Sequence, residues 1–478
     1  MAAPASDVPL HLAGNNAPVA DEVTVVPTEV EGSIPGDLAG LFVRNGPNPR
    51  TGWSSHLFEG DGMVHGLALA GGTARWYRNR YVRTPLYQHP GVARHALAFD
   101  AATNRVDHRI TTANTHVVAH AGRLLALEEG GFPYLLTPTL DTVGPYTFGG
   151  ALRTPMTAHP KVCPATGELL FFGYQLRPPY LTYHRASASG RLLASVPVTL
   201  PAATMMHDFA ITGTRVVFAD SPIVFDPAAL AAGGGPWRWD AGHQARLGVM
   251  PRAGGDGEVR WFDVEPGHLS HTANAYDRGD DEVLVTGTRL APLDGGSSTA
   301  AAAAAAAGGF GGGLPTLYQW RLDLATGAVR EGPVDDTAAE YPRIAEDRVG
   351  RSHRYAYAAS FVLDAEPDRA AVHRYDLADG AARSSHHLPS GHTCGEAVFV
   401  ASGGAASPPE GGREDDGYLL SFAHDRGRGT SYLLVLAADD IGAEPVARVH
   451  LPVRVPGGFH GSWIPDEMSD ASVSRFRS

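Results

Sequence analysis

The stretch Trp-Arg-Leu-Asp-Leu-Ala-Thr-Gly-Ala-Val-Arg at residues 320–330 resembles His-Arg-Tyr-Asp-Leu-Ala-Asp-Gly-Ala-Ala-Arg at residues 373–383. Each copy has the pattern of a strand, a turn that contains glycine, and a second strand, which indicates a β-hairpin. A spacing of roughly 50 residues between such units is typical of β-propeller blades, each made of four short strands. The pair therefore predicts an all-β fold. The chain has room for seven or eight blades after an N-terminal arm.

Short apolar runs recur on both sides of this repeat, and most are bounded by Gly, Asp or Pro. The 478 residues include 57 Gly and 36 Pro, and helical periodicity is scarce. Runs of this length between turn-forming residues predict strands. The clearest predicted strands are Arg123–Leu127, Glu168–Tyr174, Arg215–Asp220, Glu282–Gly287, Tyr418–Phe422 and Ser431–Leu436.

Two segments depart from the strand pattern. Residues 295–313 combine Gly, Ser and a run of alanines, which predicts a low-complexity surface insertion. Residues 403–417 are rich in Gly, Pro and acidic side chains and predict an exposed loop. We therefore expect an N-terminal arm over residues 1–30 and one β-propeller domain over 31–478 that contains the insertion.

Composition narrows the classes of function. The formal charge is −13, from 38 basic and 51 acidic residues, which argues against binding to nucleic acid. Lys161 is the only lysine, a skew that indicates codon bias in a GC-rich genome. Two cysteines, Cys163 and Cys394, cannot form a disulfide framework, so a reducing compartment is expected. The sequence shows neither a signal peptide nor an apolar run of ~18 residues, so we expect a cytoplasmic protein without a transmembrane helix.

Four histidines stand out among 22 because of their local settings. His159 and His460 lie beside residues that restrict or shape the backbone, Pro160 in one case and glycines in the other. Apolar segments that we expect to be buried surround His207, His271 and His460. Successive members are 48, 64 and 189 residues apart, so only the whole fold could bring them together. Four neutral imidazoles suit a borderline transition metal such as Fe(II), with positions left open for O2 or a substrate.

Three glutamates are candidates to accept a hydrogen bond from the imidazole nitrogen that does not face the metal. Glu129, Glu340 and Glu396 each stand beside apolar sequence, where a buried carboxylate needs a partner. A metal on one imidazole nitrogen and a carboxylate on the other satisfies both nitrogens. The alternative is that the glutamates cap strands or bind arginines, with Arg343 as the obvious partner of Glu340.

Several segments, together with the histidine settings, resemble the carotenoid cleavage oxygenases. They are residues 38–49, 58–65, 127–134, 159–174, 206–212, 340–343 and 455–463. The resemblance runs in order from about residue 30 to residue 465. It implies a seven-bladed β-propeller with a dome of loops and short helices over the metal face. It also implies Fe(2+) held by His159, His207, His271 and His460, with Glu129, Glu340 and Glu396 accepting hydrogen bonds from three of these histidines.

The reaction implied by the resemblance uses O2 to split a C=C bond of a carotenoid or apocarotenoid into aldehyde or ketone fragments. A hydrophobic polyene would enter through a nonpolar tunnel, so peripheral membrane contact is expected near Phe225–Trp239. Relatives that cleave stilbenoids generally carry a lysine immediately before the first glutamate. Here that position is Glu128, which favours a polyene, and stilbenoid cleavage remains the alternative.

Two functions of other classes stay open from the residues themselves. One is a non-enzymatic propeller that binds a partner on one face, and the other is a propeller hydrolase with a different metal. Other histidines could be mistaken for ligands. His268 stands near His271, His65 recurs in the family without binding metal, and His386, His387 and His392 are interpreted as surface or pocket-lining residues.

Overall fold

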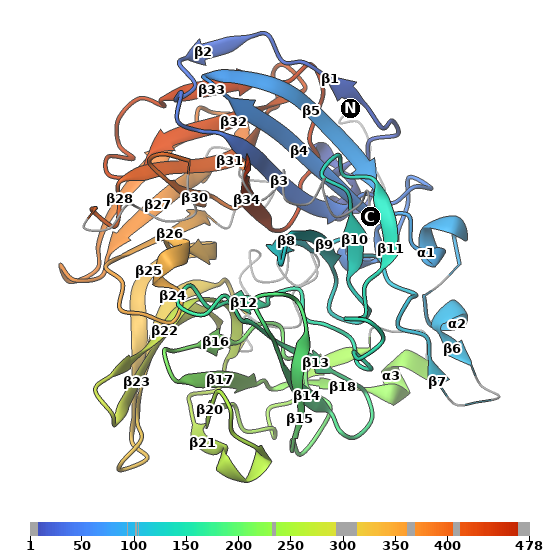
Figure 1. Ribbon diagram of the computed structural model, residues 1–478, viewed down its shortest axis with the longest axis vertical. Coiled ribbons are helices and arrows are strands. Elements are labelled where there is room, and N and C mark those ends of the chain that lie inside the picture. Colours follow the sequence, from blue (N-terminus) through green and yellow to red (C-terminus); the bar gives the residue numbers. More distant parts are fainter. Residues whose placement is uncertain are drawn as a thin grey trace, which may run out of the picture.

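The computed structural model describes residues 8–466, except 93, 101–102, 104, 232–235, 293–312, 361–368 and 405–411. The described chain is mostly β-structure, and all six strands predicted from apolar runs are present (Figure 1). The predicted insertion lies outside the described residues apart from Gly313. Residues 405–411 of the predicted loop at 403–417 also lie outside them.

Helices are few and short. Three α-helices are described, of which α1 begins at a proline and is capped by the Thr84 hydroxyl, which accepts a hydrogen bond from the Tyr87 N–H at 3.2 Å. No helix in the described part of the chain has the length and apolar character needed to cross a membrane. The α-helices are α1 (Pro85–Gln88), α2 (Arg94–Ala98) and α3 (Pro227–Ala231), and the 3₁₀ turns are η1 (Leu10–Leu12), η2 (Gly14–Asn16), η3 (Leu57–Glu59), η4 (Asp256–Glu258) and η5 (Glu346–Arg348).

One sheet joins the two ends of the described chain. Its strand order is β1-β5-β4-β3-β34, and the C-terminal strand pairs antiparallel with β3, with Arg44 opposite Gly461. This pairing fixes the segment that carries His460. The strands are β1 (Thr24–Val25), β3 (Gly40–Pro47), β4 (Gly62–Ala70), β5 (Thr73–Tyr81) and β34 (Gly461–Pro465).

Three four-stranded sheets follow along the chain. Their orders are β11-β10-β9-β8, β12-β13-β14-β15 and β16-β17-β20-β21, and every pairing is antiparallel. The strands are β8 (His116–His120), β9 (Arg123–Leu127), β10 (Tyr134–Leu136), β11 (Thr142–Pro145), β12 (Lys161–Val162), β13 (Leu169–Tyr174), β14 (Leu181–Ala186), β15 (Leu192–Val198), β16 (Ala210–Ile211), β17 (Arg215–Asp220), β20 (Arg246–Pro251) and β21 (Arg260–Asp263).

Two larger sheets and two hairpins complete the fold. One sheet runs in order from β22 to β28. The other has the order β2-β33-β32-β31-β29, with β30 also paired to β31. The strands are β2 (Val30–Gly32), β6 (Phe99–Asp100), β7 (Arg105–Val106), β18 (Ile223–Phe225), β19 (Trp237–Trp239), β22 (His268–Arg278), β23 (Glu282–Leu290), β24 (Thr316–Asp323), β25 (Val329–Arg343), β26 (Tyr355–Ser360), β27 (Ala371–Asp376), β28 (Ala382–His387), β29 (His392–Cys394), β30 (Val398–Ala401), β31 (Gly417–Asp425), β32 (Thr430–Ala437) and β33 (Ala447–His450).

The near-repeat forms two hairpins, as predicted. The first copy makes β24 and β25, and the second makes β27 and β28. In the first turn, the Asp323 carboxylate accepts hydrogen bonds from the N–H groups of Ala325 and Thr326 at 2.9 and 2.8 Å. Gly327 then has φ +85°, a conformation that favours glycine. The matching Asp and Gly of the second copy explain why the two segments look alike.

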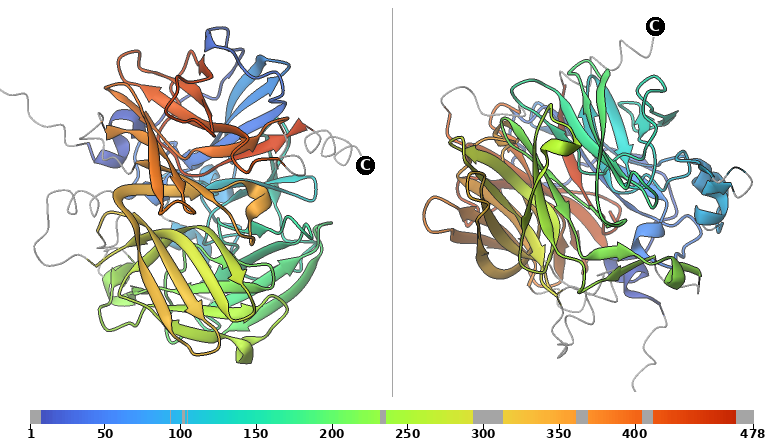
Figure 2. Two further views of the ribbon diagram at one scale, coloured as in Figure 1. Left: turned by 90° about the vertical axis from the view of Figure 1, so that its left-hand side faces the viewer. Right: turned by 90° about the horizontal axis from the view of Figure 1, so that it is seen from below.

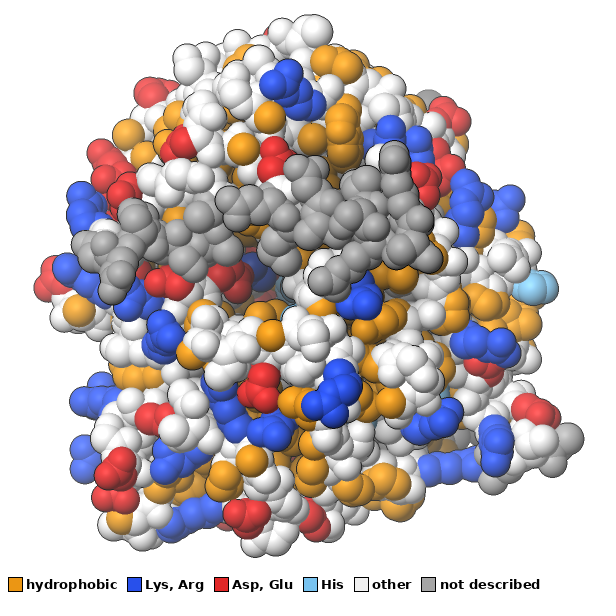
Figure 3. Space-filling model, viewed as in Figure 1, with side chains coloured by type: hydrophobic (Ala, Val, Ile, Leu, Met, Phe, Trp, Pro, Cys, Tyr) orange, Lys and Arg blue, Asp and Glu red, His pale blue; other side chains and the backbone are white. Residues whose placement is uncertain are grey.

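The sheets surround the middle of the molecule (Figures 1 and 2). Their apolar faces pack against those of neighbouring sheets. One buried cluster joins the sheet of β4 and β5 to that of β31–β33, with Phe42 and Phe422 in ring contact at 5.0 Å. Further clusters join the neighbouring sheets in turn. On the face seen in Figure 3, charges of both signs are interspersed with apolar side chains. The packing leaves the loops at the inner ends of the strands facing the centre.

Candidate metal centre

The four selected histidines meet at the centre of the molecule. They are the group His159, His207, His271 and His460, and one ring nitrogen of each lies within 4.8 Å of those of the other three. The Nε2 atoms follow one another at 3.1 Å from His159 to His207, 3.0 Å from His207 to His271 and 3.1 Å from His271 to His460. The fold therefore brings together residues that lie up to 301 positions apart, from 159 to 460.

Each histidine lies at or just before a strand near the centre of the molecule. His159 precedes β12, His207 precedes β16, and His460 immediately precedes β34. His271 lies within β22, where the pairing with β23 shifts register between Leu269 and Thr272. A bulge of this kind redirects side chains in a strand, and it lets His271 face the cluster. Gly287 on β23 is needed there, because an added Cβ would lie 2.5 Å from the His271 carbonyl oxygen.

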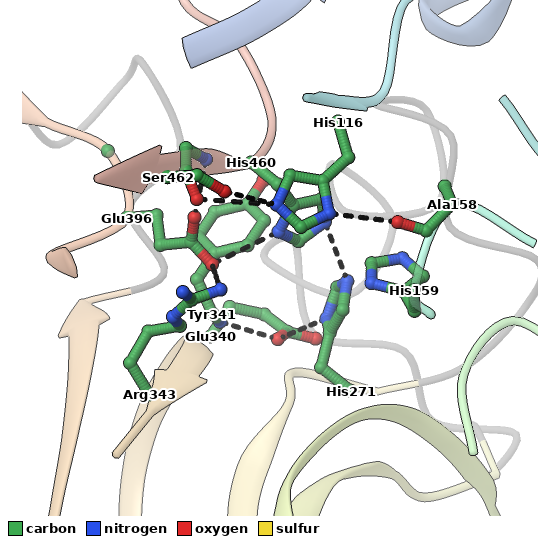
Figure 4. Close-up of polar contacts among 12 residues, drawn as sticks. His116, Ala158, His159, His271, Glu340, Tyr341, Arg343, Glu396, His460 and Ser462 are labelled. Atoms are coloured by element: carbon green, nitrogen blue, oxygen red, sulfur yellow. Dashed lines mark hydrogen bonds and ion pairs between the residues drawn. The ribbon is translucent and has the colours of Figure 1, made fainter. Parts of the chain in front are cut away.

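The three selected glutamates each contact a different histidine. Glu340 Oε2 lies 2.8 Å from Nδ1 of His271, and Glu396 Oε1 lies 3.1 Å from Nδ1 of His460 (Figure 4). Glu129 contacts Nδ1 of His207 in the same way. Within the described residues no carboxylate contacts His159, so this is the histidine without a glutamate partner.

The proposed Arg343–Glu340 alternative is not what the structure shows. Arg343 contacts Glu346 at 2.6 Å and Glu396 at 3.6 Å. Glu340 instead accepts from the Thr288 hydroxyl at 2.9 Å and the Tyr341 N–H at 2.8 Å, besides His271. Burial raises the pKa of Glu340, but His271, the Ser270 hydroxyl and the Tyr341 N–H outweigh it, so the pKa is lowered to about 2 and the group is ionised.

The electrostatics favour neutral imidazoles at two of the four positions. Burial, and then the neighbouring imidazoles, hold the pKa values of His159 and His460 well below the usual range. For His207, burial lowers the pKa, but the carboxylate of Glu129 outweighs it and the net shift is upward. The neutral rings of His159 and His460 can each offer a nitrogen lone pair to a metal ion. On His207, a cation bound at Nε2 would replace the proton that the raised pKa favours.

The arrangement is able to hold a cation. A carboxylate accepts hydrogen bonds and does not donate them, so Nδ1 of each glutamate-paired histidine carries the proton in the neutral ring. The Nε2 lone pairs of His207, His271 and His460 then face one another at 3.0 and 3.1 Å, which is repulsive unless a positive ion lies among them. The donor set therefore fits a transition metal bound by four imidazoles.

Residues that the sequence did not single out support this cluster. His116 is buried at the start of β8, with Nδ1 2.9 Å from the Ala158 carbonyl and Nε2 3.1 Å from the Ser462 hydroxyl (Figure 4). It thus links the residues next to His159 and His460. Tyr341 has φ +57° and places its ring 5.5 Å from that of His271 and 5.3 Å from that of His460. Burial within a strand is the only signal that could have pointed to His116.

The remaining histidines considered from sequence have other partners. His268 is buried and lies 2.7 Å from the Ser221 hydroxyl, and His65 lies 2.9 Å from the Tyr77 hydroxyl. His392 lies in β29 with Nδ1 3.0 Å from the Tyr432 hydroxyl, outside the four-histidine cluster. None of these three belongs to the four-histidine group.

Glu128, the residue before Glu129, is held by a set of partners of its own. Its carboxylate contacts Arg94 at 3.0 Å and accepts from the Thr111 hydroxyl at 2.7 Å and the Gly130 N–H at 2.9 Å. The arginine neutralises it, so the position does not carry a free negative charge. The neighbouring Glu129 also accepts a hydrogen bond from the Tyr174 hydroxyl at 2.8 Å, and the Tyr174 ring packs against Trp237 at 6.0 Å. Hairpin β18–β19 is thereby connected to the cluster.

Comparison with known proteins agrees with the geometry. The family model of RPE65, the retinal pigment epithelial membrane protein, matches residues 16–465. A carotenoid cleavage oxygenase of Mycobacterium tuberculosis is 38% identical over 511 aligned residues, covering 95% of this chain and 97% of the relative. Among solved structures, the lignostilbene dioxygenase of Pseudomonas brassicacearum matches with a TM-score of 0.82 at 29% identity, covering 97% and 100% of the two chains.

The apocarotenoid oxygenase of Synechocystis matches with a TM-score of 0.80 at 26% identity, over 94% of this chain and 97% of its own. That protein has also been solved in a cobalt-substituted form. The sequence relatives and the solved structures match nearly the full length of this chain. The match covers the mostly β fold and includes every residue of the four-histidine site. This chain therefore belongs to the RPE65 and carotenoid cleavage oxygenase family, and it is an oxygenase of that family.

Proposed function

We propose that this protein is a non-heme Fe(II) dioxygenase that cleaves a C=C bond of a carotenoid or apocarotenoid. The observation that carries the proposal is the convergence of four imidazole Nε2 atoms, with glutamates behind three of them. In the reaction, O2 and one double bond give two carbonyl fragments. Both oxygen atoms end in the products, so the balance needs no other reductant.

The donor set supports iron. The three successive Nε2 separations are 3.1, 3.0 and 3.1 Å, so one ion could contact the four imidazoles together. Four neutral imidazoles suit a borderline transition metal such as Fe(II) and would leave positions for O2.

The bound iron would supply the site for O2 and the electrons that start its reaction with the double bond. The chain's own residues hold it there. Glu340 and Glu396 fix Nδ1–H of their histidines, and this fixes both the ring orientation and the nitrogen that faces the metal. Burial of the four ligands excludes bulk water and so limits side reactions of the activated oxygen.

For the fold, the proposal is a seven-bladed β-propeller over residues 31–478, closed by β34 beside β3. Four-stranded antiparallel units and the pairing of the two chain ends in one sheet support it. Loops and the short helices would form the dome over the metal. The apolar side chains Phe99 and Val106 oppose each other on hairpin β6–β7, and 42% and 52% of their surfaces are exposed. They offer a second candidate for peripheral membrane contact besides hairpin β18–β19.

Stilbenoid cleavage is the second candidate, favoured by the match to the lignostilbene dioxygenase. Glu128 takes the place of the lysine, and its ion pair with Arg94 leaves no free charge of either sign at this position. The polyene proposal rests on the absence of a free ammonium at this position and on the identity with carotenoid-cleaving relatives.

The test is iron analysis followed by chromatography of products from carotenoids, apocarotenals and stilbenes under labelled O2. We expect one iron per chain and labelled carbonyl products from at least one polyene, with little conversion of stilbenes. Stilbene cleavage without any polyene cleavage would reverse the order of the two candidates. Absence of bound iron, with no uptake of O2, would overturn the enzyme proposal and favour a binding scaffold.

A further inference from the structure

The only lysine of this chain lies next to the metal centre. Lys161 stands two residues after His159, at the first position of β12. Its Nζ lies 2.8 Å from Oδ1 of Asp208, the residue that follows His207. Only 18% of the Lys161 side chain and 2% of the Asp208 side chain are exposed. An ion pair at this depth connects two of the segments that carry the ligands.

The Asp208 carboxylate also binds the segment that carries a third ligand, His271. Asp208 Oδ2 accepts hydrogen bonds from the N–H and the hydroxyl of Thr272 at 2.7 and 2.8 Å. Thr272 follows His271, and its hydroxyl lies 3.0 Å from the Phe209 carbonyl as well. Because Asp208 Oδ1 also accepts from the Phe209 N–H at 2.7 Å, the carboxylate has little freedom to move.

The residue type at position 161 is informative in this chain. Of 38 basic residues one is lysine, so the other 37 are arginines. Arginine has a longer, planar group with five donors, whereas the ammonium of lysine is compact and can approach one carboxylate oxygen. Both carboxylate oxygens of Asp208 already accept hydrogen bonds, so the compact ammonium of lysine suits the space left beside Oδ1.

We propose that Lys161 is a positioning residue for the metal centre, acting through Asp208 to hold the His159, His207 and His271 segments in register. The inference rests on the metal site of the proposed function. A buried carboxylate without its cation is strongly unfavourable, so loss of Lys161 would make Asp208 move or bind water. Either change would displace the backbone next to His207 and His271.

The experiment measures Co(II) affinity by chelator competition, the visible spectrum of the Co(II) protein and the melting temperature of the metal-free protein. The variants are Lys161→Met, Lys161→Arg, Asp208→Asn and the double variant Lys161→Met with Asp208→Asn. Arg374→Met is the matched control, because Arg374 and Asp415 form an ion pair at 2.6 Å with 16% and 3% of their side chains exposed.

We expect Lys161→Met to weaken Co(II) binding about 10–100-fold and to change the spectrum. Substitutions of residues that orient metal ligands have effects of this size. In the Asp208→Asn background the same substitution should change affinity less than about twofold, because the two residues act together. Lys161→Arg keeps the charge, so it should stay folded, yet it should still shift the spectrum and weaken binding. Arg374→Met should lower the melting temperature alone.

Three results would overturn the inference. They are wild-type affinity and spectrum in Lys161→Arg, an equal effect of Lys161→Met in both backgrounds, and a loss no larger than that of Arg374→Met. A wild-type protein that binds no Co(II) or iron would instead overturn the proposed metal site itself. If Lys161→Met does not fold, the Co(II) affinity and spectrum of Lys161→Arg still decide the first of these outcomes, and wild-type values there overturn the inference.

Discussion

Single side chains account for most of what the site can do. In the proposed metal centre the four imidazoles would supply the ligands, and the glutamates bonded to their Nδ1 atoms would select which nitrogen faces the metal. His271 and His460 each have a glutamate at Nδ1, whereas His159 has none among the described residues. This asymmetry leads to different expectations for substitutions at the ligands and at the glutamates.

Replacement of any ligand by alanine should abolish activity and most of the bound iron. His159→Ala, His207→Ala and His271→Ala each remove one of four donors, and the cavity left cannot supply another. His268→Ala is the matched control, because His268 is equally buried but bonds to Ser221 instead of facing the cluster. Iron content by mass spectrometry checks the prediction. Full iron in His271→Ala together with loss in His268→Ala would show that the ligand is misassigned.

Glutamine at Glu129, Glu340 or Glu396 should weaken iron binding or activity by ~10–100-fold, since an amide oxygen is a weaker acceptor for an imidazole N–H. Glu340→Gln should be among the most affected, because this carboxylate also holds the Thr288 hydroxyl and the Tyr341 N–H. Iron affinity and kcat in the three variants give the measurement. Unchanged values in all three would remove the glutamates from the site.

Strands and loops show how far local pattern predicts structure. The apolar runs and the Asp–Gly turns act over a few residues, so they predicted six strands and two hairpins from sequence. The register shift that turns His271 inward depends on the partner strand β23, and no local pattern indicates it. The ion pair of Glu128 with Arg94 likewise depends on helix α2, which is distant in sequence.

Residues 295–312 should be replaceable by a short Gly-Ser linker. They lie outside the described residues, but the ends of the segment are close, since the Gly313 N–H donates to the Ala291 carbonyl at 2.7 Å. Closing a shorter loop over this gap costs little entropy. The melting temperature and the iron content of the shortened protein should match those of the parent. A fall of several degrees would indicate that the segment packs against the fold.

The molecule as a whole buries histidines in their neutral form, and this makes its stability depend on pH. Burial lowers the pKa to about 3 for His116 and His268 and to about 4 for His184, His353 and His373. In the unfolded chain each would titrate near the ordinary value of ~6.5. Between these values the unfolded chain binds more protons than the folded protein, so stability is present above pH ~6.5 and is lost as the pH falls.

The predicted consequence is a steep fall in melting temperature between about pH 6 and pH 4, where each such histidine contributes up to about 1.4 kcal/mol per pH unit. His184→Gln should reduce this slope, since His184 lies between the Thr154 and Ser195 hydroxyls, 2.8 and 2.9 Å away, and an amide can bond to both without titrating. Calorimetry across this range is the measurement. A flat profile in the parent protein would contradict the burial of neutral imidazoles.

The chain's own residues indicated the all-β class, the strand positions, the two hairpins and the identity of the four histidines, because strand period, turn chemistry and residue settings are local properties. The pairing of each glutamate with its histidine, the missing partner of His159, the role of His116 and the Lys161–Asp208–Thr272 contacts came only with the tertiary structure. These contacts join residues that are tens to hundreds of positions apart. Their geometry is set by how whole sheets pack around the centre, and no short segment encodes it.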